Sequence, residues 1–417
     1  MDWRRRQLQA AALAAILVLC TGATAIASFG QDGKRVVGGL GVATDALPYG
    51  KSRTLLVSAY ESKLRLTRLR ANGAIDPGFG KNGKVDLPGT AAAVRPNGRI
   101  LVLSTGSAGN PTGFNPILTQ LLPDGSVDDS FGEEGKVGVD LGHVYDEGAA
   151  MAVLPGNRIA VAGRSGDSIG YRADVIEGDP VVMRLLPGGK PDPSFGVDGR
   201  VSAPEAEEPA ALKSGPQGTI YLQDGSSFRR LIRLTRTGSL DHSFGQQGAV
   251  TIPSTVEPPE TFFLPHGDFA VLRGGGVMIA ASLSTSGRGF EHGKVGVLRL
   301  RPDGGVSGAY GNGGLARVGV PGGWVSAAGV AATADGRAVV VGSSQVPLGS
   351  RSHLTAVALT PAGKLDRRFG RGGRMRIGSG TWVTGDDLFL RHGKALLVGG
   401  MRGAKTLLAQ VPLVRHR

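Results

Sequence analysis

The sequence predicts an all-β fold: a seven-bladed β-propeller of four-stranded antiparallel blades, in which the N-terminal strand completes the last blade. Two observations predict it. A phrase of the form G-x-x-D-x-x-F-G-x-x-G recurs along the chain, and short apolar runs bounded by glycine and proline fill the intervals. Four strands in a repeat of about 50 residues is typical of a propeller blade.

The first 27 residues are typical of an export signal. Three arginines (4–6) precede an apolar stretch, Ala11–Cys20, and small-residue cleavage sites follow at Ala25 or Ala27. An uncleaved anchor is the alternative, but the stretch is short for a span. A lipoprotein signal at Cys20 is disfavoured because Leu17-Val18-Leu19 places a bulky leucine where such signals have a small residue. We therefore expect residues 1–27 to be a signal peptide and residues 28–417 a single secreted or extracytoplasmic propeller, with no stable membrane insertion after cleavage.

Cysteine usage fits the same expectation. Cys20, inside the signal, is the one cysteine of the chain. The mature protein would therefore have no disulfide, no thiolate nucleophile and no cysteine metal site.

Each copy of the phrase centres on an aromatic anchor, and the anchors recur every 49 to 66 residues: Phe29, Phe79, Phe131, Phe195, Phe244, Tyr310 and Phe369. A glycine stands six residues before each internal anchor. An aspartate stands three residues before five of them: Asp76, Asp128, Asp192, Asp241 and Asp366. We expect the aromatics to be buried between neighbouring sheets and the aspartates to cap their own turns. Recurrence at a turn makes these aspartates structural rather than calcium ligands or catalytic acids.

Between anchors the strand-like runs are rich in valine, isoleucine and leucine. In the second unit they are Ala91–Arg95, Arg99–Ser104, Ile117–Leu122 and Gly135–Asp140. The C-terminus supplies three runs without an anchor: Val383–Arg391, Ala395–Gly400 and Thr406–Val414. The N-terminal run Phe29–Val37 supplies the fourth, so seven anchors predict seven blades. In the first anchor only Phe29, Gly30 and Gly33 would then pack.

The segments "LTQLLPDGSVDDSFGEEGKV" and "VVMRLLPGGKPDPSFGVDGRV" make the chain resemble the delta-60 repeat family, a propeller domain of unknown function in bacterial exported proteins. The resemblance covers essentially residues 28–417. It implies fold and export, and brings no established activity, cofactor or catalytic residue. The copy at Tyr310 departs from the pattern, with Ser307 in place of the aspartate, and its turn is expected to be looser.

The formal net charge is +13, but the basic residues are scattered. No nucleic-acid motif accompanies them, so nucleic-acid binding is not expected. Weak attraction to anionic envelope polymers remains. We expect no cofactor, and we expect the protein to be a monomer.

Length variation gathers in loops that share one face of the ring, where binding usually occurs. These insertions are Gly106–Pro116, Arg164–Pro180, Ala203–Pro209, Pro253–Gly267, Ser284–Gly293 and Ser343–Ser352. The binding candidates near them are Tyr145, Tyr171, Arg172, Phe262, His266, Phe290, His292, Trp324 and Trp382. Three of these aromatics, Tyr145, Trp324 and Trp382, lie where first strands begin. They either surround the mouth of the axial channel or pack between blades.

His266 and His292 come from adjacent loops of the fifth blade. With Glu260 or Glu291 they form either a metal or acid/base pair or two solvated histidines. No catalytic residue and no metal site is assigned. Residues 166–170 match G-x-S-x-G, but no helix can follow, so a nucleophile elbow is not expected.

The sequence thus predicts an exported, non-catalytic binding scaffold that presents its long-loop face to an envelope protein or glycan. The alternative is a propeller hydrolase or lyase that acts at the axial mouth with histidine and carboxylate groups. The fold alone does not decide between these functions.

Overall fold

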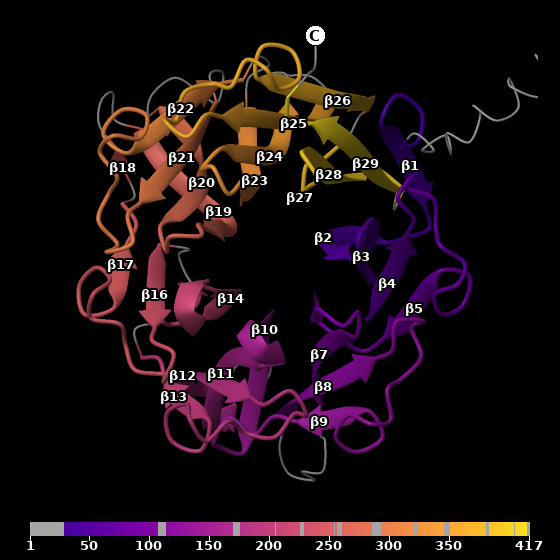
Figure 1. The fold of residues 1–417 in the computed structure, drawn as a ribbon, viewed down its shortest axis with the longest axis vertical. Coiled ribbons are helices and arrows are strands. Elements are labelled where there is room, and N and C mark those ends of the chain that lie inside the picture. Colours follow the sequence, from indigo (N-terminus) through magenta and orange to yellow (C-terminus); the bar gives the residue numbers. More distant parts are fainter. Residues whose placement is uncertain are drawn as a thin grey trace, which may run out of the picture.

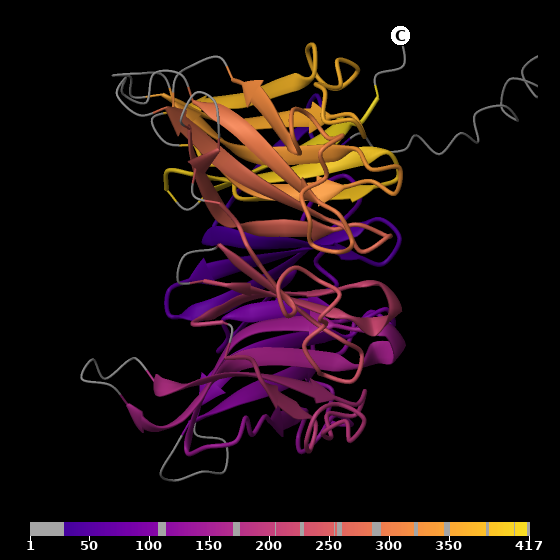
Figure 2. The same ribbon diagram turned by 90° about the vertical axis from the view of Figure 1, so that its left-hand side faces the viewer.

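The computed structural model describes residues 29–106, 114–169, 176–204, 206–225, 229–253, 255–256, 261–285, 293–320, 324–345, 351–380, 383–403 and 405–414. The predicted signal peptide lies outside them. The described residues form seven antiparallel sheets arranged as blades around a central axis (Figure 1). Seen edge-on, the ring is a disc whose thickness the strands cross (Figure 2). The predicted seven-bladed propeller is confirmed.

In every blade the first of the four regular strands is innermost and the other three follow outward; in blade 5 this innermost strand is Thr261–Val271 (Figure 1). Blade 1 is β2 (Val42–Tyr49), β3 (Arg53–Tyr60), β4 (Lys63–Leu69) and β5 (Lys84–Leu87). Blade 2 is β6 (Ala91–Val94), β7 (Ile100–Gly106), β8 (Asn115–Leu121) and β9 (Lys136–Gly138). Blade 3 is β10 (Tyr145–Val153), β11 (Ile159–Ile169), β12 (Ile176–Leu185) and β13 (Arg200–Ser202). Blade 4 is β14 (Pro209–Ser214), β15 (Ile220–Asp224), β16 (Arg230–Leu234) and β17 (Ala249–Thr251).

The remaining blades continue round the ring. Blade 5 is β18 (Thr255–Val256), β19 (Thr261–Val271), β20 (Val277–Thr285), β21 (Lys294–Leu300) and β22 (Leu315–Gly319). Blade 6 is β23 (Trp324–Ala332), β24 (Ala338–Gln345), β25 (Ser352–Leu359) and β26 (Arg374–Gly380). Blade 7 is β27 (Asp387–Arg391), β28 (Lys394–Met401), β29 (Lys405–Pro412) and β1 (Lys34–Gly38). Two 3₁₀ turns, Pro155–Asn157 and Pro216–Gly218, join first to second strands in blades 3 and 4.

The N-terminal strand closes the ring as predicted. β1 pairs antiparallel with β29, from Lys34 opposite Ala409 to Gly38 opposite Lys405. Phe29 is 7% exposed, Gly30 N–H donates to the Asn72 carbonyl of blade 1 (3.1 Å), and Gly33 accepts from Gln410 N–H (2.8 Å). The two ends of the chain therefore share blade 7.

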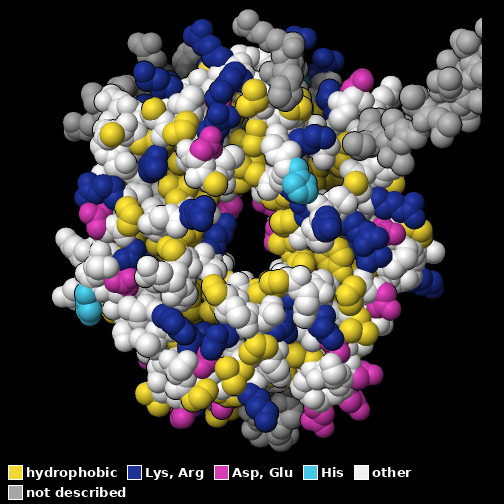
Figure 3. All heavy atoms as spheres, viewed as in Figure 1, with side chains coloured by type: hydrophobic (Ala, Val, Ile, Leu, Met, Phe, Trp, Pro, Cys, Tyr) yellow, Lys and Arg dark blue, Asp and Glu magenta, His cyan; other side chains and the backbone are white. Residues whose placement is uncertain are grey.

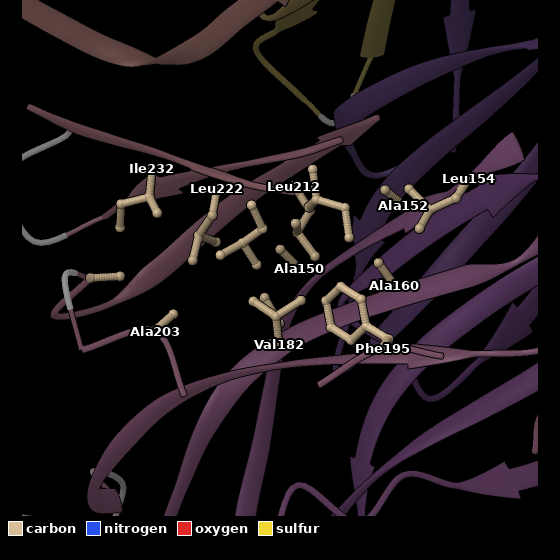
Figure 4. Packing of buried hydrophobic residues seen from close by; sticks show 14 of the residues in the cluster. Ala150, Ala152, Leu154, Ala160, Val182, Phe195, Ala203, Leu212, Leu222 and Ile232 are labelled. Atoms are coloured by element: carbon tan, nitrogen blue, oxygen red, sulfur yellow. The ribbon is translucent and has the colours of Figure 1, made fainter. Parts of the chain in front are cut away.

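The apolar cores lie between blades, which is why each repeat needs a neighbour. Figure 4 shows one such core, where Phe195 and Val182 of blade 3 meet Leu212 and Leu222 of blade 4. All seven aromatic anchors are buried, at 0–7% exposed. The prediction that they pack between neighbouring sheets is confirmed.

The glycine that follows the aromatic anchor bonds to the next blade at several junctions. Gly80 N–H donates to the Asp124 carbonyl, and Gly196, Gly245 and Gly311 make the equivalent bond at three later junctions. A Cβ at Gly125, in the turn opposite, would lie 2.9 Å from the Phe79 ring. Glycine is therefore required there by the close approach as well as by its positive φ of 92°.

Three expectations need correction. Blade 5 has a fifth strand, because Thr255 and Val256 pair with β19. The insertions are partly strand: β11 and β12 extend to Ile169 and from Ile176, since their ladder continues past the regular blade edge. The turn before Tyr310 is not looser, because the Tyr310 N–H still donates to the Ser307 carbonyl at 2.9 Å. The Phe131 N–H donates to the Asp128 carbonyl in the same way.

Among the described residues, no helix is long and apolar enough to cross a bilayer.

Candidate functional site

Of the nine predicted binding residues, Tyr145 is the one whose side chain is described. Tyr171, Arg172, Phe290, His292 and Trp382 lie outside the described residues. Phe262 and His266 are in β19 and Trp324 begins β23, but their side chains are outside the described part of the chain. The proposed His266–His292 pair is therefore not tested.

Tyr145 lies at the start of β10, on the long-loop face between blades 2 and 3. Its ring is half-buried and lies 6.1 Å, centroid to centroid, from the ring of Phe114, which is 44% exposed. Val144 beside it is 38% exposed, and His143 Nδ1 lies 3.1 Å from Asp167. Among the residues that the structure describes, the long-loop face thus carries an exposed aromatic pair with polar neighbours.

The residues 166–170 that match G-x-S-x-G do not form a nucleophile elbow. Gly166 pairs with Tyr145 and Ser168 with Glu177, so the segment is strand through Ile169. A strand in this place lacks the sharp strand-to-helix turn that exposes such a serine.

The repeat aspartates are buried in ion pairs, which sequence analysis missed. Asp192 accepts from Arg184 Nε (2.9 Å) and Arg158 Nε (2.8 Å), and also caps the Ser194 amide (3.0 Å). Burial opposes ionisation, but hydrogen bonds from Ser194 and Arg158 hold the pKa of Asp192 to about 2. Asp192 therefore joins two arginines to its own turn. The available signal was an arginine eight residues before the aspartate in blades 1, 3 and 4.

The hollow of the molecule is the axial channel, a cavity of about 450 Å³. All seven blades contribute to it, mostly through small side chains of the innermost strands. The charged groups on its wall are Asp45, Lys213, Asp268, Asp386 and Asp387. Figure 3 shows the opening in the centre of the ring, with acidic and basic side chains at its edge. A channel with four carboxyls and one ammonium is acidic, although the chain as a whole is basic.

Two of these carboxyls form a pair across the junction of blades 7 and 1. The Ala46 N–H donates to Asp45 Oδ1 and to Asp387 Oδ2, both at 2.7 Å. Two neighbouring carboxylates cannot both ionise cheaply. Burial, followed by the charge of Asp45, raises the pKa of Asp387 well above its usual range, and burial raises the pKa of Asp45. The two carboxyls are therefore coupled, and each disfavours ionisation of the other.

The third carboxyl, Asp268, is already paired. Lys213 Nζ of blade 4 donates to Asp268 Oδ1, and the Phe269 N–H donates to the same oxygen at 2.8 Å. Lys213 also lies 5.2 Å from the Phe269 ring centroid. The fourth, Asp386, has a buried Oδ2 with no hydrogen-bond partner, and burial raises its pKa.

Asp45, Asp268 and Asp387 occupy one equivalent position in blades 1, 5 and 7. Asp45 stands eight residues before Arg53, which begins the second strand of blade 1. Asp268 stands eight residues before Gly276, which directly precedes the second strand of blade 5. Asp387 stands seven before Lys394 because its turn is one residue shorter. The other blades have small residues there: Ala91, Ala150, Ala211 and Gly329. An alignment of the first strands of the blades reveals these three aspartates, whereas an alignment of the aromatic anchors does not.

Among the described residues, no group of three or more histidine, cysteine, aspartate or glutamate side chains is arranged to hold a metal ion.

Residues 95–131 and 218–244 match the family model described as "Domain of unknown function (DUF5122) beta-propeller". The match supports a propeller repeat of unknown function, and the delta-60 likeness remains a resemblance. The sequence matches none of the curated proteins.

Several solved structures are similar in shape, at low sequence identity. A protein from Lactobacillus plantarum is 15% identical over 81% of this chain and 84% of its own, with a TM-score of 0.44. The PQQ-bound aldose sugar dehydrogenase of Streptomyces coelicolor is 13% identical over 91% and 98%, with a TM-score of 0.39. A protein of unknown function from Dyadobacter fermentans is 12% identical over 92% and 100%, with a TM-score of 0.40. No activity is inferred from likenesses this weak.

Proposed function

We propose that the protein is an exported binding module that takes a cationic group of its ligand, a primary ammonium, into the axial channel. One observation carries the proposal. The channel, about 450 Å³ in volume, holds four carboxyls against one lysine, and the Asp45–Asp387 pair has no cationic partner among the described residues. Cation binding would relieve the repulsion between these two carboxylates.

The channel already contains an example of the interaction. Lys213 places an ammonium against Asp268, and Asp268 is the blade-5 equivalent of Asp45 and Asp387. The wall opposite is lined by alanines of β6, β10 and β14, which leave room for an alkyl chain. An alkylammonium ligand therefore suits both the carboxyls and the apolar wall of the channel.

Calorimetric titration with 1,4-diaminobutane tests the proposal. Binding should release a proton from the Asp45–Asp387 pair and should tighten as the pH rises through the pKa of that pair. Asp387→Asn should weaken binding at least tenfold, which corresponds to about 1.4 kcal/mol. Asp129→Asn removes one exposed carboxylate outside the channel and is the matched control. Equal affinity in both variants would rule out the channel as the site.

The partner on the long-loop face is an envelope protein or glycan in this proposal. The Phe114–Tyr145 pair supports it, because exposed aromatics stack on sugar rings and anchor protein interfaces. Pull-down from an envelope extract should lose its partner in a Phe114→Ser, Tyr145→Ser variant. A Val197→Ser variant, which removes an exposed side chain elsewhere, should retain it. Retention by both variants would reject this face.

A hydrolase or lyase at the axis is the second candidate, and the raised pKa of Asp387 beside Asp45 favours it. A carboxyl whose pKa is raised can act as general acid beside an ionised partner. Turnover of glycoside or ester substrates that depends on both Asp45 and Asp387, with a bell-shaped pH profile, would establish this activity. Turnover unchanged in Asp45→Asn would exclude it.

A further inference from the structure

Arginines at one repeated position each bind a carboxylate on the short-turn face, opposite the long loops. Arg184 donates through Nε to Asp192 and through Nη2 to Ser194 (2.7 Å), and Nη1 donates to a carbonyl of the next blade. Arg233 repeats the arrangement with Asp241 and Ser243. Both guanidiniums are buried, at 3% and 6% exposed. All five donors of an arginine need acceptors when it is buried.

Blade 5 keeps this arginine and lacks its partners. Arg299 Nη1 still donates to a carbonyl of the next blade, Pro361, at 2.9 Å. Ser307 stands in place of the aspartate, and Ala309 in place of the serine. No carboxylate or hydroxyl of the described residues therefore accepts from Arg299 Nε or Nη2. The guanidinium is accordingly only half-buried.

A second substitution opens the space beside it. In blades 1, 2 and 3 the aspartate is also held by an arginine at the start of the second strand, such as Arg158. Blade 5 has Gly276 at that position. The lost aspartate, serine and arginine side chains leave a cavity of about 270 Å³, whose polar lining is Arg273, Arg299, Arg301, Ser307, Thr333 and Asp335.

The charges around this cavity leave Arg299 unneutralised. Arg301 binds Asp303 (2.9 Å), and Asp335 binds Arg337 (3.1 Å). Arg273 is exposed at the rim and has no acidic partner among the described residues. Two cationic side chains thus face a space from which the repeat's own carboxylate is missing.

We propose that this cavity, between blades 5 and 6, binds the carboxylate group of a small organic anion. The carboxylate takes the place of the missing aspartate side chain and accepts two hydrogen bonds, from Nε and Nη2 of Arg299. Planar side-on pairing of this kind is the preferred geometry of arginine with carboxylate. The Ser307 and Thr333 hydroxyls and Arg273 supply further donors at the cavity wall. The site lies on the face opposite the long loops and does not depend on the axial channel.

Thermal unfolding in sodium acetate tests the proposal, with sodium chloride at equal ionic strength as reference. Acetate is the smallest analogue of the missing side chain. The unfolding midpoint should rise in a saturable manner in wild type, as expected for a ligand that binds the folded state. It should rise equally in Ser307→Ala, which leaves the cavity open. The rise should disappear in Arg299→Gln and in Ser307→Asp, which fills the site with a carboxylate of its own.

Two outcomes would overturn the site. One is a midpoint that does not rise with acetate in wild type. The other is the same rise in Ser307→Asp and Arg299→Gln as in wild type, which means that acetate acts elsewhere. Sodium phosphate separates the ligand classes: a larger rise with phosphate than with acetate would contradict the choice of a carboxylate.

A variant of blade 4 provides an independent check. Asp241→Ser with Ser243→Ala converts the Arg233 site to the blade-5 pattern. This variant should unfold at a lower temperature than wild type and should recover part of the loss in acetate, beyond the rise seen in wild type. No recovery, in a variant that still folds, would show that an arginine without its aspartate does not make a carboxylate site.

Discussion

Two groups of aspartates differ in the charges around them. The rim aspartates are those of the anchor turns, such as Asp192, and they contact arginines. The axial aspartates Asp45 and Asp387 contact each other. At the rim, Asp192 lies between two arginines, and its pKa is held to about 2 although burial opposes ionisation. At the axis, Asp387 faces Asp45, and burial and the like charge raise its pKa. Ionised aspartate is thus favoured at the rim, where arginines neutralise it, and disfavoured at the axis, where a second carboxyl repels it. Perturbation by a like charge in an open channel is the pattern expected of a functional site.

The junction of blades 7 and 1 shows what happens where the rim arrangement is missing. Gln410 takes the position of Arg68, since its amide donates to Gly33 as Arg68 donates to Gly83. The acid that normally follows is replaced by Ile26, outside the described residues. At this junction the Asp45–Asp387 pair bridges the two blades through the Ala46 amide. The proposed cation site and the closure of the ring therefore lie at the same junction.

The largest effect is expected from removing the closing strand. Deletion of residues 28–37 takes away the Phe29 anchor and the β1–β29 ladder. Loss of a buried phenylalanine alone costs about 3–5 kcal/mol. The variant should be poorly soluble or should unfold well below the parent temperature by calorimetry. Val36→Thr, in the same strand but 51% exposed, should melt like wild type. A deletion variant that melts like the parent would refute the closure.

Single substitutions should separate the rim from the axis. Asp192→Ala leaves Arg184 buried without its partner and should cost about 3–5 kcal/mol in urea unfolding. Asp387→Asn removes a like-charge contact and keeps an acceptor for the Ala46 amide, so its effect should stay within about 1 kcal/mol. Comparable losses in both variants would mean that the two regions have the same structural role.

Acid should reduce the contribution of the rim aspartates to the free energy of unfolding. The pKa of Asp128 and that of Asp192 are each lowered to about 2, so the stability from these groups is present above the unfolded pKa and is lost as the pH falls through the folded one. Each should contribute about 2 kcal/mol that disappears between roughly pH 4 and 2. Urea midpoints across this range in wild type and Asp192→Asn measure it. An equally steep acid limb in both would contradict the assignment.

The contribution of the axial pair Asp45 and Asp387 to stability should change with pH in the opposite direction, and this effect should be the smallest. Because the folded pKa of Asp45 and Asp387 is raised, their contribution is present at low pH and is lost as the pH rises through the folded pKa. Wild type should therefore lose stability on that rise relative to the Asp45→Asn, Asp387→Asn double variant. The groups that face the pair, Lys213, Asp268 and Asp386, are unchanged in both. Parallel pH profiles would show that the two carboxyls are not coupled.

The fold could be predicted because the repeat records it directly. Glycine at positive φ, a buried aromatic and a capping aspartate recur at fixed spacing, and Phe29 without preceding strands predicts the closure. The axial site could not be predicted in the same way. Asp45, Asp268 and Asp387 come from blades far apart in sequence, and they meet only because seven first strands converge on one axis. Search by local clusters favoured the histidine-bearing loops instead.

The pairing of β1 with β29 also sets the order in which the molecule can be completed. The ribosome delivers Lys34 before the other six blades and its partner Ala409 after them. Until then β1 is an unpaired edge, and blade 7 is incomplete. A nascent chain therefore remains an open array of blades, and the axial channel and the ring form together once β29 has been made.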